Sequence, residues 1–119
     1  MIIIEGNHIS LVRGDSATIN LTIKDKKTNQ EYILEVGDIV RFSVKKEIQS
    51  NDIVIQKQFN NNEIVLDYED TKDLSFGDYV YDVELQYSDG QRDTIIRPST
   101  FTLLSEVHNS WIMKKTKLI

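Results

Sequence analysis

Apolar and polar residues alternate over much of the chain, which is the pattern of half-buried β-strands. The alternation is clearest over 79–87, and it recurs over 17–24 and 40–45. Weaker runs of the same kind predict strands over 8–12, 32–35, 53–59, 63–68, 94–97 and 100–104. We therefore expect an all-β fold of about seven to nine short strands.

Residues typical of turns separate these runs, and the clearest hairpin has Asp89-Gly90 at its tip. Asp-Gly suits a two-residue type I′ turn. A two-residue loop would place Leu85 opposite Thr94, whereas a three-residue loop would place it opposite Asp93. We favour the two-residue loop. The side chains then expected to face inward are Val83, Leu85, Thr94 and Ile96.

One short segment, near 70–75, has the composition of a helical turn. Asp70 or Thr71 is expected to cap it and Gly77 to end it. A helix of this length is not stable alone, so we interpret it as a crossover between strands. The side chains expected to plug one end of the fold are Leu74 and Phe76.

Short strands with turns every 8–12 residues are typical of a single antiparallel β-sandwich of the Ig-like kind. We assign the sandwich to 1–107 and a C-terminal tail to 108–119. The expected core comprises Ile19, Leu21, Val40, Phe42, Val44, Tyr81, Val83, Leu85 and Phe101.

Composition narrows the possible functions. The chain has no cysteine, which excludes disulfide scaffolds, thiolate metal sites and thiol catalysis. No apolar run approaches the ~20 residues of a membrane-spanning helix, and the first residues lack the basic start of a signal peptide. With 14 basic and 19 acidic residues the net charge is −5, which argues against a nucleic-acid partner.

No catalytic or metal-binding motif stands out. His8 and His108 are a hundred residues apart, and neither has a nucleophile motif beside it. We therefore expect no enzyme activity and no cofactor. The acidic residues weighed as calcium ligands are Asp67, Glu69, Asp70, Asp73, Asp78, Asp82 and Glu84. They lack the spacing of a calcium loop, so we interpret them as solvated or capping groups and expect no metal site.

Two further motifs have alternative interpretations. The tripeptide Arg13-Gly14-Asp15 occurs in cell-adhesion ligands, but three-residue matches are common and a tight turn is the simpler interpretation. The rings of Tyr79, Tyr81 and Tyr87 are either a stacking platform for sugars or the packed face of a strand. Their register with Val83 favours packing.

The tail carries an unusual mixture of apolar and basic residues. Tryptophan and methionine are enriched at the centre of protein interfaces, and lysines suit a rim facing an acidic partner. The residues expected to bind a partner are Trp111, Ile112, Met113, Lys114 and Lys115. The alternatives are a solvated tail and a segment that folds back on its own domain.

Three sequence blocks, within 11–16, 36–45 and 69–85, have a familiar arrangement of turns and strands. With Gly90, Phe101 and Val107, they resemble small β-sandwich domains of phage and prophage tails and baseplates in Gram-positive bacteria. The N-terminal domain of upper baseplate proteins is one example.

The resemblance covers about residues 8–107. It implies a non-enzymatic virion structural protein that is made in the bacterial cytoplasm and assembles with copies of itself or with other virion proteins. The alternative from another class is a carbohydrate-binding or cell-surface adhesion module, which the tyrosine run suggests. Neither function implies a cofactor, a nucleic acid or a membrane.

Overall fold

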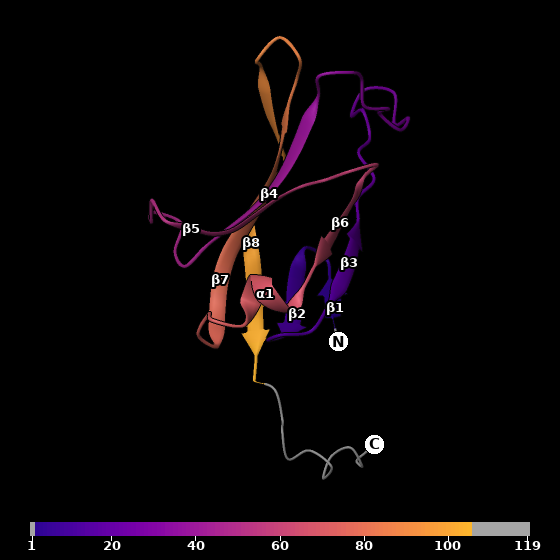
Figure 1. The fold of residues 1–119 in the computed structure, drawn as a ribbon. Coiled ribbons are helices and arrows are strands. Elements are labelled where there is room, and N and C mark those ends of the chain that lie inside the picture. Colours follow the sequence, from indigo (N-terminus) through magenta and orange to yellow (C-terminus); the bar gives the residue numbers. More distant parts are fainter. Residues whose placement is uncertain (1, 106–119) are drawn as a thin grey trace.

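The computed structural model describes residues 2–105, which form an all-β fold with one short helix (Figure 1). The elements in chain order are β1 (Ile2–Glu5), β2 (His8–Val12), β3 (Ala17–Asn20), β4 (Ile39–Lys45), β5 (Ile53–Gln58), β6 (Glu63–Leu66), α1 (Tyr68–Thr71), β7 (Gly77–Gln86) and β8 (Arg92–Leu104). The β7–β8 hairpin tip lies at one end of the molecule, and the end of β8 lies at the other.

The strands form a six-stranded sheet in the order β1-β2-β8-β7-β4-β5 and a two-stranded sheet of β3 and β6. Neighbouring strands are antiparallel except β2 and β8, which are parallel, with Ile9 opposite Phe101. The expectation of purely antiparallel sheets is therefore wrong. Parallel neighbours need a long connection, and residues 13–91 lie between these two strands.

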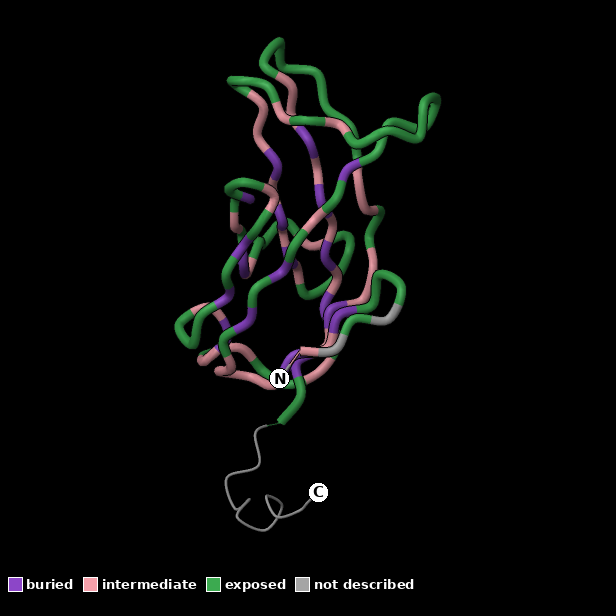
Figure 2. Tube along the Cα trace, turned by 90° about the vertical axis from the view of Figure 1, so that its right-hand side faces the viewer, coloured by how far each residue is buried: buried purple, intermediate pink, exposed green. Residues whose placement is uncertain are grey.

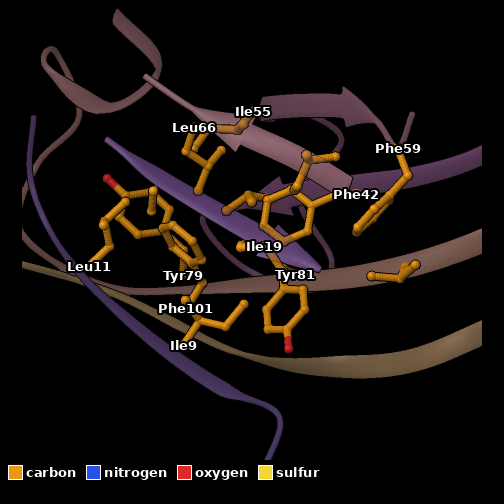
Figure 3. Close-up of a cluster of buried hydrophobic side chains, with 14 of the residues drawn as sticks. Ile9, Leu11, Ile19, Phe42, Ile55, Phe59, Leu66, Tyr79, Tyr81 and Phe101 are labelled. Carbon is orange, nitrogen blue, oxygen red and sulfur yellow. The ribbon is translucent and has the colours of Figure 1, made fainter. Parts of the chain in front are cut away.

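One hydrophobic core joins the two sheets (Figure 3). Alternate residues of β4 and β7 are buried, and they face Ile19 of β3 and the buried residues of β6. All nine expected core residues lie in or against this core. Leu21 is less buried than the other eight. It is only half-buried, because β3 ends at Asn20.

Several strand boundaries differ from the expected ones. The segment 32–35 forms no strand, while Ile2–Glu5 forms an edge strand that we did not expect. The predicted strands 94–97 and 100–104 are a single strand, β8. Pro98 lies within it, at an irregularity in the pairing with β7. A bulge tolerates a proline because the bulged residue does not need to donate a backbone N–H to the neighbouring strand.

The β7–β8 hairpin has a three-residue loop, so the favoured two-residue loop is wrong. The Tyr87 N–H donates to the Gln91 carbonyl, and Leu85 lies opposite Asp93. Gly90 has φ +93°, a conformation that glycine adopts easily. Between Glu84 and Val83 the pairing of the two strands shifts by one residue, so Val83 lies opposite Ile96, as expected. Thr94, which was expected to face inward, is exposed.

The helix lies at Tyr68–Thr71, slightly before the expected segment. Asp67 is the N-cap residue, and Asp70 completes a capping box, because its carboxylate accepts a hydrogen bond from the Asp67 N–H at 2.8 Å. The expected capping role of Asp70 is therefore confirmed in this form, whereas Thr71 is the last residue of the helix. Gly77 begins β7 instead of ending the helix. Leu74 is half-buried, whereas Phe76 is 45% exposed and does not plug the core.

Candidate interaction surface

The candidate surface is at the lower end of the six-stranded sheet, where β8 ends (Figure 1). Three apolar residues belong to this end. Val12 of β2 pairs with Leu104 of β8, and Gly77 of β7 pairs with Leu103. Phe76 directly precedes Gly77 in the chain and therefore lies next to this end of the sheet. We call Val12, Leu104 and Phe76 the base row.

Two members of the base row, Leu104 and Val12, lie on the outer face of the sheet. In β8, Phe101 and Leu103 are buried in the core, so alternation turns Leu104 outward, where it is 40% exposed. Phe76 is 45% exposed and Val12 is half-buried. Neighbouring exposed apolar side chains on a sheet face are typical of an interaction surface.

The Arg13-Gly14-Asp15 turn holds the base row in place. The Arg13 guanidinium stacks over the Phe76 ring, 4.0 Å from its centroid, and donates to the Leu74 carbonyl at 3.2 Å. The Arg13 N–H donates to the Leu104 carbonyl. These contacts connect β2, β8 and the segment before β7.

The same turn is bonded to the helix. Gly14, with φ +87°, donates its N–H to the buried Thr71 hydroxyl at 2.8 Å. The Asp15 N–H donates to the Val12 carbonyl and closes the turn. An adhesion ligand needs an exposed, mobile loop, so these contacts favour the interpretation as a structural turn.

Charged groups surround the helix next to this turn. Lys57 of β5 lies 3.0 Å from the Asp70 carboxylate, and Lys72 lies 2.8 Å from Glu69. Hydrogen bonding to Glu69 raises the pKa of Lys72. Among residues 2–105, no group of three or more histidine or acidic side chains is arranged to hold a metal ion.

Above the base row, the outer face of the sheet becomes polar. The His8 Nε2 lies 3.0 Å from the Thr102 hydroxyl, which donates to Asp78 at 2.7 Å. The order is histidine, hydroxyl, carboxylate. A nucleophilic triad instead places histidine between the hydroxyl and the carboxylate, so this chain of bonds lacks its geometry.

Further along β7, Asp82 and Glu84 lie half-buried on the outer face. Partial burial, and then the neighbouring Glu84 carboxylate, raise the pKa of Asp82, while Lys45 acts in the opposite direction. Arg92 pairs with Glu84 at 3.2 Å. The upper part of this face is therefore charged, in contrast to the base row.

The tyrosine run does not form a platform. Tyr79 and Tyr81 are each only 3% exposed. The Tyr81 hydroxyl donates to the Asn7 carbonyl, and burial raises the pKa of Tyr81. With these two rings in the core, the structural feature that suggested a carbohydrate-binding module is lost.

Tyr87 is half-buried at the opposite end of the molecule, where its ring meets Tyr32 edge to face at 6.1 Å. Its hydroxyl donates to Asp93 at 2.7 Å, which raises the pKa of Tyr87 to about 12. Tyr32 donates in the same way to Asp38 at 2.6 Å. These rings are engaged with each other and with carboxylates.

The five residues expected to bind a partner, Trp111 to Lys115, lie outside the described residues, as do His108 and the domain boundary at 107. The base row was missed, although the sequence carried one signal for it. Leu103-Leu104 breaks the alternation of β8, so one of the two leucines must face away from the core.

Comparisons with family models, with curated proteins and with solved structures found no match to this chain. None of the helices within residues 2–105 has the length and apolar character to cross a membrane.

Proposed function

We propose that this protein is a non-enzymatic assembly module of a phage or prophage tail or baseplate. In this proposal the two sheets form an Ig-like β-sandwich, and the protein is a virion component made in the bacterial cytoplasm. Its partners are copies of itself or other virion proteins.

The base row is the observation that carries the assembly role. Leu104 and Phe76 are 40% and 45% exposed at the same end of the sheet, and the Arg13 guanidinium stacks on the Phe76 ring. Aromatic and arginine side chains are enriched in protein interfaces. A surface of this composition supports binding to another protein.

The viral context comes from the sequence resemblance, and the fold is compatible with it. The block 11–16 spans the end of β2 and its bonded turn, and 36–45 leads into and forms β4. The block 69–85 contains most of α1 and β7. The similar residues are therefore those that build the sheet and the turn beside the base row.

Deletion of the gene from the phage or prophage tests the proposal. Electron microscopy of the induced particles should show incomplete or missing tails or baseplates, and expression of the gene in trans should restore them. Complete, normal tails in the deletion strain would contradict the proposal.

A further inference from the structure

The base row is exposed next to a chain segment of complementary character. The sequence continues for fourteen residues after Ser105, and Trp111, Ile112 and Met113 are followed by three lysines. Trp111 is six residues beyond Ser105, which corresponds to about 20 Å of extended chain. A second copy packed against this end would be within this reach.

Charge favours the same pairing. Three of the 14 basic residues and one of the 19 acidic residues follow Ser105, so residues 1–105 carry −7 and residues 106–119 carry +2. Asp15, Asp73 and Asp78 lie on the segments that flank the base row. Opposite net charges speed association and orient the partners.

The direction of β8 indicates which molecule receives the segment. The strand runs toward the lower end of the molecule and ends there, beside the base row (Figure 1). Ser105 follows β8 directly, so the chain beyond it starts at the end of the molecule that carries the base row. A second copy that packs against this end would meet both the base row and the start of this segment.

From these observations we infer that the segment 111–115 of one copy binds the base row of a second copy. The inference rests on the proposed assembly role and names its contact surface. The aliphatic and indole side chains cover Leu104 and Phe76, while Lys114 and Lys115 face the acidic body. Because the segment leaves from the end that carries the base row, two copies can exchange segments around a two-fold axis.

The single tryptophan reports on this contact directly. In the full-length protein, sedimentation velocity should show reversible dimers, and the Trp111 emission maximum should shift to shorter wavelength as the protein concentration rises. The variant Phe76→Ser/Leu104→Ser should weaken dimerisation by about ten-fold or more and reduce the shift. Added salt should weaken it as well, because part of the attraction is electrostatic.

A matched control replaces exposed apolar residues at the other end of the molecule. Ile33 and Val36 are 69% and 99% exposed, and Ile33→Ser/Val36→Ser should leave dimerisation unchanged. Circular dichroism and urea unfolding of both double variants verify that they are folded.

Mixing two variants tests the exchange. Trp111→Ser retains the base row, and Phe76→Ser/Leu104→Ser retains the segment. A dimer of either variant alone has neither intact contact between a segment and a base row. In a mixed pair, the intact segment of one variant can bind the intact base row of the other. The mixture should therefore dimerise more strongly than either variant alone.

Three outcomes would overturn the inference. A Trp111 emission that is independent of concentration, but sensitive to the base-row variant, would show binding within one chain. Dimers that survive the base-row variant would place the contact elsewhere, and a monomer up to about 100 µM would exclude self-association at concentrations typical of weak complexes.

The outcomes also separate this inference from the proposed function. Defective particles in the deletion strain together with a monomeric protein would contradict only the docking surface. Normal particles together with base-row dimers would contradict only the role in tail or baseplate assembly.

Discussion

The two halves of β8 share one strand but have different surroundings. Phe101–Leu104 pairs with β2 on one side and β7 on the other, while the first part of the strand, from Arg92, pairs only with β7. Phe101 and Leu103 are almost fully buried, whereas the first half has no buried residue. The loops at the upper end of the molecule are exposed or half-buried (Figure 2). Burial along this strand therefore depends on the neighbours that cover it.

The lower half is also the more heavily cross-linked by polar contacts. Arg13, Gly14 and Thr71 connect β2, β8 and α1 there. At the upper end, the hairpin loop is held by its own backbone, by the Asp89 side chain and the Tyr87–Asp93 bond, and by a backbone hydrogen bond from Ser88 to Asp38. We therefore expect the upper end to open locally before the lower end does.

The largest expected difference between the halves comes from truncating one core side chain in each. Phe101→Ala removes a fully buried ring that contacts Phe42 and Tyr81, and should cost about 3–5 kcal/mol. Ile96→Ala removes a half-buried side chain and should cost roughly 1–2 kcal/mol. Urea unfolding measures both, and equal losses would contradict the comparison.

A smaller loss is expected from Thr71→Val, which keeps the shape of the side chain and removes its hydroxyl. The Gly14 N–H then loses its acceptor next to a fully buried side chain, which should cost about 1–3 kcal/mol. Thr18→Val on the exposed face of β3 is the control and should be close to neutral. A neutral Thr71→Val would mean that the turn is held by other contacts.

Gly90→Val should destabilise the hairpin by about 1 kcal/mol or more, because a β-branched residue resists φ +93°. Hydrogen exchange should accelerate in the amides of Arg92 to Thr94. The amides of Phe101 to Leu104 should exchange as slowly as they do in the native protein. Acceleration in both halves would show that β8 opens as one unit.

The smallest effect concerns the Tyr87–Asp93 bond and depends on pH. The pKa of Tyr87 is raised from 10 to about 12 in the folded state, so its contribution to stability is present below pH 10 and is lost between about pH 10 and 12. Tyr87→Phe should be slightly less stable than the native protein at pH 7, by no more than about 1 kcal/mol. The difference in melting temperature should shrink as the pH rises through this range, and a constant difference would argue against the bond.

Periodicity alone determined most strands and the part of the core that lies on the clearest of them, eight of the 18 buried hydrophobic residues among 2–105. Val40, Phe42 and Val44 alternate with polar residues, and their burial follows because a strand turns successive side chains to opposite faces. The same reasoning placed Tyr79 and Tyr81 inside. These features depend on a few neighbouring residues, so the sequence contains what is needed to predict them.

Tertiary structure decided the features that depend on distant residues. The parallel pairing of β2 with β8 joins segments about ninety residues apart, and the Thr71 hydroxyl receives a hydrogen bond from Gly14. The base row exists because three strands end at one place, and only one of its members, Leu104, interrupts a local pattern. Alternation specifies which face a side chain occupies, whereas the strand neighbours determine whether that face meets the core, another strand or solvent.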